Sequence, residues 1–441
     1  MVNIGDSYTN GKPVEAWKVL DTETKQKLTN LFLAGLLFWI SITLMLPTLP
    51  TYIQSMGGTT KQVGMVMSCF AIGLIASRTW LGKVADRRSR KLVILIGAFV
   101  AAVAPVGYLL VHSIAGLGYI RAFHGISIAA FTIGYSALVV DLAPLQHRGT
   151  LIGYMNLAVP IGMSIGPALG GFLQQSGKQF VPDGTGYEIL FLISIICGVL
   201  ALLLASQIKE SSLPGKTSNN SADAPAIQRD FWQLTQDPGL IVPTIVLMLI
   251  GLVFGTLVAF LPLFITELQL DFNVGFFYTV VAIASFSVRL FIGQASDRYG
   301  RGLFISGSLV CYIISMILLT QAETPAMFIL SAIAEGAGAG VLIPLVLALI
   351  SDRSYANERG KVFALCMGGF DVGIAMGGLI LGSLAAFLGG YRGIFALAAV
   401  LAGVALFIFI TQAGKSIRHS LFFALGKAKD TYTIIDAPHY K

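Results

Sequence analysis

Two carboxylic acids lie deep inside long apolar stretches of the sequence, Glu335 and Asp371. A carboxyl group in low-dielectric surroundings resists ionisation, so it can take up a proton on one side of a membrane and release it on the other. Arg121 and His124 lie together in another apolar stretch. We expect these four residues to carry proton coupling, with Glu335 the stronger candidate of the two acids. Arg121 would stabilise a charged acid or bind an anionic substrate, and the alternative for His124 is a hydrogen bond to a neighbouring helix.

The composition around these residues excludes a soluble fold. Of the 441 residues, 55% are hydrophobic and only 12% are charged, whereas soluble domains carry about 25% charged residues. The formal net charge of +7 does not indicate a nucleic-acid partner, because the basic residues lie in alternate loops between apolar stretches. A bilayer core of roughly 30 Å needs roughly 20 apolar residues per helix. Twelve stretches of this kind are present, at residues 30–52, 62–82, 92–112, 116–141, 150–173, 187–206, 240–266, 273–293, 303–321, 325–350, 361–388 and 391–412.

One long polar stretch separates six spans from six. The expected parts are a tail at residues 1–29, a first half at 30–206, a flexible linker at 207–239, a second half at 240–412 and a tail at 413–441. Most of the 29 Lys and Arg residues lie in the tails, the linker and the even-numbered loops, whereas the odd-numbered loops hold only Lys61, Lys178 and Arg392. Because positive charge concentrates in cytoplasmic loops, we expect an inner-membrane protein with both termini in the cytoplasm.

The two halves repeat one another at a constant offset of 211 residues. The matching pairs are charged or glycine residues: Arg78 with Arg289, Gly82 with Gly293, Asp86 with Asp297, Gly125 with Gly336, Asp141 with Asp352, Gly162 with Gly373 and Gly166 with Gly377. Parallel repeats of six spans place a substrate site near mid-membrane between the halves. The predicted fold class is therefore an all-α membrane protein of twelve transmembrane helices in two pseudo-symmetric six-helix halves. We expect it to act as a monomer in the lipid bilayer.

A loop of mixed charge follows the second span, from Gly82 to Lys91, and a second copy runs from Gly293 to Gly302. The glycine permits close helix contact and a tight exit from the bilayer, and the basic residues can pair with an acid such as Asp141. This pattern resembles the loop signature of the major facilitator superfamily, although Ser89 stands where that family usually has glycine. The resemblance implies the major facilitator fold and a latch whose release lets the halves rock. Its gating residues would be Gly82, Asp86, Arg87, Arg90, Asp141, Gly293, Asp297, Arg298, Arg301 and Asp352.

Glycines recur every fourth residue along the fifth span, so they form one smooth face that a neighbouring helix can approach. Two prolines in the same span remove backbone hydrogen bonds and permit a bend. The set resembles the antiporter signature of the drug:proton antiporter branch, and ordinary small-residue packing is the alternative explanation. The residues of this signature are Gly153, Gly162, Gly166, Pro167, Gly170 and Gly171.

The stretch around Arg121 and His124 resembles the fourth-helix motif of the same family. Many exporters of this branch carry an acid in the first span, which here has none, so the expected coupling shifts to the second half. Candidates for lining the substrate cavity are Trp39, Tyr135, Asn156, Phe254 and Tyr278, with packing as the alternative for the aromatic ones. The four cysteines lie in apolar stretches without a CxxC pair, so we expect neither a metal nor a cofactor.

These observations predict a secondary transporter whose partners are a small-molecule substrate and protons. The main prediction is proton-coupled efflux of a small organic molecule, such as a drug, metabolite, sugar or siderophore-like compound, by alternating access. The alternative within transporters is a proton-coupled sugar or metabolite uptake symporter. Two other classes stay open: a membrane enzyme, which turnover of a lipid or acyl donor would revive, and a sensor that moves no solute.

Overall fold

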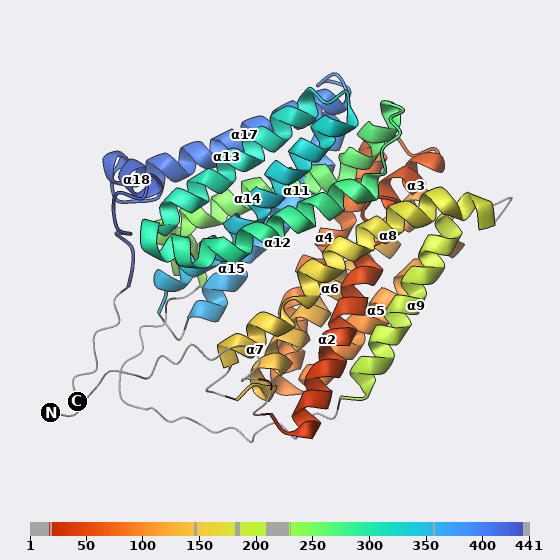
Figure 1. Cartoon of the computed structure of the whole chain (residues 1–441), viewed down its shortest axis with the longest axis horizontal. Coiled ribbons are helices and arrows are strands. Elements are labelled where there is room, and N and C mark those ends of the chain that lie inside the picture. Colours follow the sequence, from red (N-terminus) through yellow and green to blue (C-terminus); the bar gives the residue numbers. More distant parts are fainter. Residues whose placement is uncertain are drawn as a thin grey trace.

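The computed structural model describes residue 17 and residues 20–144, 148–180, 186–208, 229, 231–355 and 358–434. Within these residues every regular element is a helix (Figure 1). The helices of the first half are α2 (Thr22–Thr43), α3 (Leu49–Ser55), α4 (Thr60–Arg87), α5 (Arg90–Leu110), α6 (Ile114–Leu142), α7 (Arg148–Met155), α8 (Ala158–Phe180) and α9 (Tyr187–Ser206). Polar side chains begin several of them: Asp21 accepts from the Thr24 amide at 3.0 Å, and Ser89 accepts from the Leu92 amide at 2.9 Å, which satisfies amides that the helix itself leaves free.

The second half repeats this order. Its helices are α11 (Pro238–Glu267), α12 (Val274–Tyr299), α13 (Arg301–Thr320), α14 (Pro325–Asp352), α15 (Arg359–Met376), the π-helix η2 (Gly377–Leu381), α16 (Gly382–Leu384) and α17 (Tyr391–Gln412). Two short helices flank it, α10 (Phe231–Gln236) and α18 (Ile417–Ala424). Helix α10 lies within the residues expected as the linker.

Eleven helices of the described residues are long and apolar enough to cross a membrane. The predicted first span, residues 30–52, is not among these eleven. Helix α2 starts in polar sequence at Thr22 and ends at Thr43, and a turn with Pro47 leads into the short α3. Because proline cannot continue a helix interior, this span is divided, and together with the eleven it gives the predicted twelve.

The helices form two groups that meet along a restricted surface. In the first group α2 packs on α8 and α9, and α6 on α4 and α5; in the second, α11 packs on α15 and α17, and α14 on α12 and α13. Between the groups, α8 packs on α12, and α4 packs on α15, η2 and α16. We call the end at which α4 finishes and α11 starts the linker end, and the opposite end the far end. The groups are close together at the far end and spread apart toward the linker end (Figure 1).

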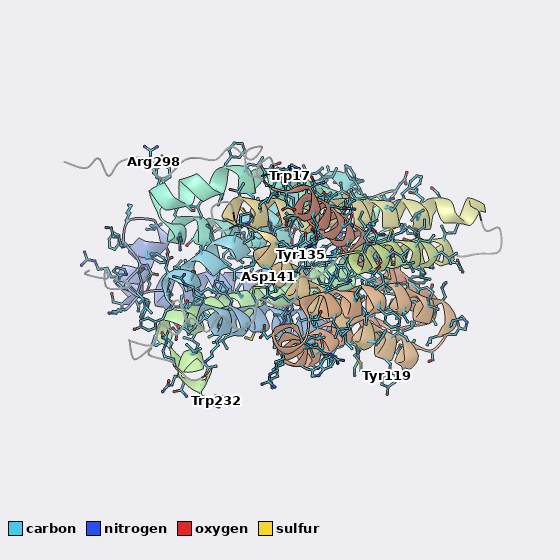
Figure 2. All side chains as sticks on the ribbon, turned by 90° about the horizontal axis from the view of Figure 1, so that it is seen from below. Trp17, Tyr119, Tyr135, Asp141, Trp232 and Arg298 are labelled. Carbon is cyan, nitrogen blue, oxygen red and sulfur yellow. The ribbon has the colours of Figure 1, made fainter. Side chains whose placement is uncertain are left out.

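Large aromatic side chains mark both ends of the bundle. Tyr119, near the start of α6, is 78% exposed, and Trp232 in α10 is 69% exposed. Figure 2 shows both projecting from the surface at well-separated positions along the molecule. Tyr and Trp are enriched at the two membrane–water interfaces, so these residues fit a bundle that crosses a bilayer between them.

Candidate functional site

The glycines of α8 bring this helix against α2, as their spacing predicts. A Cβ on Gly162 would lie 2.5 Å from the Trp39 side chain, and a Cβ on Gly170 would lie 2.0 Å from the Leu44 carbonyl oxygen. The hydroxyl of Thr43 donates to the Gly162 carbonyl at 3.0 Å. Larger residues would separate the two helices.

The last glycine of the same motif faces the other half. A Cβ on Gly171 would lie 2.0 Å from the side chain of Asn273, the N-cap of α12. The hydroxyl of Thr279 in α12 donates to the Ser164 carbonyl of α8 at 3.3 Å. The motif therefore holds α8 to its own half with one face and to the second half with another.

The residues Gly162 to Gly166 also match the Gly-x-Ser-x-Gly spacing of a hydrolase nucleophile elbow. That motif requires a sharp turn from a strand into a helix. Ser164 instead lies inside α8, where its hydroxyl donates to the Pro160 carbonyl at 2.8 Å. This serine is a helix-interior residue and not a nucleophile.

Helix α4 meets η2 through a second glycine contact. A Cβ on Gly64 would lie 2.1 Å from the Gly378 carbonyl oxygen, and a Cβ on Gly378 would lie 2.7 Å from the Gly64 oxygen. Thr60, at the start of α4, lies 3.3 Å from the Tyr391 hydroxyl of α17. These contacts are at the far end, so the structure is closed there and open toward the linker end.

An ion pair joins the halves nearer the linker end. Arg78 of α4 and Asp371 of α15 are 2.8 Å apart, with side chains 30% and 8% exposed. Arg78 lies fourteen residues from Gly64, about 21 Å along α4, whereas Asp371 lies seven residues from Gly378, about 10 Å along its helix. The pair therefore lies away from the glycine contact, toward the linker end of both helices.

The structure does not bring Arg121 to a buried acid among the described residues, and its alternative role in binding an anionic substrate stays a prediction. Its guanidinium is 4.3 Å from the centroid of the Phe70 ring, inside the first half, and the residue is 4% exposed. Among the described residues its Nε and Nη1 have no hydrogen-bond partner. Arg78 takes the place beside Asp371, because α4 rather than α6 faces α15.

His124 makes the helix-to-helix contact that was its alternative role. The ring is fully buried, and its Nδ1 lies 3.2 Å from the Tyr108 hydroxyl of α5. Its Nε2 has no partner within the described part of the chain. The proton-coupling role of this residue stays a prediction.

Glu335 lies inside the second half and is 1% exposed. Its carboxylate is close enough to the phenols of Tyr278 and Tyr312 to interact electrostatically with both. Glu335 Oε2 and the Tyr278 hydroxyl find no hydrogen-bond partner among the described residues. An unpaired charge would be costly in such surroundings, so Glu335 stays a candidate for carrying a proton.

The loop motifs form ion pairs within each half. Arg90 pairs with Asp141, as predicted, and Arg301 pairs with Asp352 at the same 211-residue offset. Each pair connects neighbouring helices of one half, α5 to α6 and α13 to α14, because both of its members belong to the same half. The expectation that these pairs hold the halves together does not apply to this arrangement.

Other gating candidates lie apart from any helix contact. A Cβ on Gly82 would meet nothing within 4 Å, so the expected close contact is absent here and α4 continues to Arg87. Asp86, Arg87 and Arg298 are exposed. Gly293 and Asp297 lie in α12, and the side chain of Asp297 falls outside what the structure describes.

The five predicted cavity residues come from several helices of both halves. Tyr135 is 5% exposed and donates to the Met155 carbonyl at 2.7 Å, which is a packing role. Figure 2 shows it within the body of the molecule. Asn156 is exposed at the break between α7 and α8, Trp39 is half-buried on α2, and Phe254 stacks on Phe370 at 6.2 Å. Tyr278 is buried beside Glu335.

Sequence reasoning missed the pairing of Arg78 with Asp371. It also missed that His124 and Glu335 are themselves separated by 211 residues. Each precedes a packing glycine: a Cβ on Gly125 would lie 1.9 Å from the Phe70 oxygen, and one on Gly336 would lie 2.3 Å from the Val281 oxygen. The same offset could therefore have placed the two buried ionisable groups at equivalent positions.

Comparisons with known proteins agree with this arrangement. A family profile described as Major Facilitator Superfamily matches residues 31–320 and 274–421. The chain is similar to the Multidrug resistance protein MdtG of Klebsiella pneumoniae (strain 342), with 27% identity over 400 residues, 87% of this chain and 92% of the relative. It is 26% identical over 396 residues to the protein of the same name from Salmonella choleraesuis (strain SC-B67), covering 87% of this chain and 93% of that relative.

Solved structures share the fold. The nucleoside transporter NupG superposes with a TM-score of 0.72 at 16% identity, covering 88% of this chain and 98% of its own. The D-xylose-proton symporter superposes with a TM-score of 0.70 at 17% identity, covering 93% and 99%.

Two helical halves that close at one end, diverge at the other and carry buried ionisable groups define a membrane transport protein. The chain belongs to the major facilitator superfamily. It is a multi-pass inner-membrane secondary transporter, and its relatives and structural neighbours are transporters rather than enzymes.

Proposed function

We propose that this chain exports an amphipathic organic compound from the cytoplasm in exchange for protons, by alternating access between residues 30–206 and residues 240–412. The similarity to proteins named for multidrug resistance supports the substrate class. The concentration of Lys and Arg at the linker end supports a cytoplasmic location for that end, for the linker and for both termini. The structure would then be the form open to the cytoplasm.

The observation that carries proton coupling is the ion pair between Arg78 and Asp371. It joins α4 of one half to α15 of the other. Protonation of Asp371 removes the negative charge and with it an attraction of roughly 1 to 4 kcal/mol, depending on the effective dielectric constant. A proton therefore changes a contact between the two moving bodies, which is what biases a two-state equilibrium.

Glu335 is a second proton acceptor in this proposal, with a different position. Its described neighbours Tyr278 and Tyr312 belong to its own half. Protonation there does not alter a contact between the halves. We therefore assign the primary coupling role to Asp371, with Glu335 as an auxiliary site and with His124 as a candidate for proton transfer within the first half and Arg121 as a fixed positive charge near it.

The test uses purified protein in liposomes, with ethidium as the fluorescent substrate and an imposed pH gradient. Asp371→Asn is expected to abolish pH-driven movement of ethidium while exchange down a concentration gradient remains measurable. Glu267→Gln is the matched control, because Glu267 is an exposed acid at the far end. Wild-type pH-driven movement by Asp371→Asn contradicts the coupling role. Accumulation of the dye in the direction of proton flow would instead identify a symporter.

A further inference from the structure

Helix α18 lies across the linker end of the second half (Figure 1), packed on α13 and α17. Its buried face consists of Ser420, Phe423 and Ala424. The Ser420 hydroxyl accepts from the Gly414 amide at 2.8 Å, and the rings of Phe423 and Phe409 are 6.0 Å apart. This face fixes the helix to the bundle.

A second face of α18 is apolar and uncovered. Ile417, Leu421 and Leu425 recur every fourth residue, so they share one face, and they are 69%, 45% and 48% exposed. The outer side of α17 leads toward them, with Val400 59% exposed and Phe407 62% exposed. In a membrane protein an exposed apolar side of a span faces lipid, and the stripe on α18 extends that side to the end of the bundle.

A cavity opens where this stripe begins. It has a volume of about 310 Å³ and lies between the start of α11, the end of α17 and the start of α18. Aliphatic and polar side chains both line it, among them Ile241, Val242, Thr411, Gln412, Lys415 and Ser416. A cavity lined by both hydrogen-bond donors and aliphatic carbons fits a molecule that has a polar group and an apolar portion.

The charge around the cavity is positive. Lys415 lines it, and Arg418, one turn further along, is exposed with its Cζ 5.8 Å from the centroid of the Phe422 ring. Two described acids lie close in sequence to the cavity lining or to α18, and both are paired: Asp237 with Arg229, and Asp430 with Arg353 at 2.8 Å. Clustered Lys and Arg at the membrane surface attract anionic lipid, by about 1 kcal/mol for each residue.

The segment after α18 anchors the C-terminal end of this helix to the second half. The Asp430 carboxylate binds Arg353 through two hydrogen bonds, at 2.8 and 2.9 Å, and the Ile434 amide donates to the Asp352 carbonyl at 2.8 Å. Helix α18 is therefore held from both sides before any ligand arrives. Such preorganisation lowers the entropic cost of binding.

We propose that α18 and the cavity at its start form a binding site for an anionic phospholipid. The phosphodiester group lies against Lys415 and the Ser416 hydroxyl, with Arg418 as a second positive charge, and the acyl chains continue along Ile417 and the outer side of α17. This site is separate from the ion pair at Asp371 and does not depend on the direction of transport.

The test is a titration of delipidated, detergent-purified full-length protein with a fluorescently labelled phosphatidylglycerol. Lys415→Gln combined with Arg418→Gln is expected to weaken binding, by roughly five-fold for each charge removed. The matched control is Lys427→Gln combined with Lys429→Gln, which removes the same charge from two exposed residues beyond the end of α18, and it should bind as the wild type does. Size-exclusion profiles check that both variants are folded.

Competition identifies the ligand. Unlabelled phosphatidylglycerol should displace the probe, whereas phosphatidylcholine and inorganic phosphate should not. Displacement by phosphatidylcholine at the same concentration overturns the selectivity for anionic lipid. Displacement by inorganic phosphate identifies a general anion site, and an unchanged affinity in the Lys415 and Arg418 variant overturns the location.

Discussion

Replacing Asp430 by alanine should detach the C-terminal segment from the second half. Its partner Arg353 has a side chain only 1% exposed, and it donates to Asp430 through Nε and Nη2 and to the carbonyls of Gly239 and Ala413 at 2.7 and 3.0 Å. In Asp430→Ala, Arg353 keeps its two hydrogen bonds to backbone carbonyls and loses its two hydrogen bonds to the carboxylate. A buried cation that loses its partner costs about 3 to 5 kcal/mol.

We expect the lower end of that range, about 3 kcal/mol, because the Asp430 side chain is 10% exposed and water can reach the gap. Since each 1.4 kcal/mol changes an equilibrium tenfold, the detached form becomes roughly 100 times more populated. Hydrogen exchange reports this directly, because the Ile434 amide bonds to the Asp352 carbonyl only in the attached form. Its protection from exchange should fall by the same factor.

Two further variants separate this explanation from a general loss of stability. Lys429→Gln changes a neighbouring exposed residue and should leave the exchange of Ile434 unchanged. Combining Arg353→Met with Asp430→Leu should restore much of the protection, since an apolar pair avoids the unpaired charge. Wild-type protection of Ile434 in Asp430→Ala would refute the assignment of the ion pair as the attachment.

Three other predictions concern topology, packing and pH. Reporter fusions at Ser218 and in the C-terminal tail should both read cytoplasmic and a fusion at Gly184 external; opposite readings at Ser218 and the tail would contradict an even number of spans between them. Gly166→Val should lower the yield of monodisperse protein in size-exclusion chromatography, because a Cβ there lies 2.0 Å from an atom of α2, whereas Gly153→Ala meets open space and should not. Glu358, just before α15, pairs with Arg229. Burial raises the pKa of Glu358, but hydrogen bonds from Arg229 and from the Tyr355 amide, together with the charge of Arg229, outweigh this effect, so the net pKa is lowered. The stabilisation is therefore present above the usual glutamate value of about 4.3 and is lost as pH falls through the lowered pKa; thermal unfolding between about pH 3 and 6 measures it, and a flat profile in the wild type contradicts it.

The fold could be predicted from the sequence, because the length of each apolar stretch and the repeated charge pattern can be read directly along the chain. The turn that ends α2 at Thr43 was not anticipated, because Pro47 and Pro50 lie in an otherwise apolar run that reads as continuous. The pair of Arg90 with Asp141 was predictable, since the loop motif places both at the same end of neighbouring spans. Which arginine meets Asp371 was not, because it depends on which helix of the first half faces α15.

That choice follows from a difference between the two repeats. At the 211-residue offset Arg78 corresponds to Arg289, but Asp371 corresponds to Pro160. Arg289 is exposed, and proline has no side-chain group to pair with it. The contact of α4 with α15 therefore carries a charge that a proton can remove, whereas the equivalent contact of α12 with α8 is made by glycines and hydroxyls. The residues that the repeats share build the common scaffold. Under the proposed mechanism, protonation at only one of the two equivalent contacts would then control the motion of the halves.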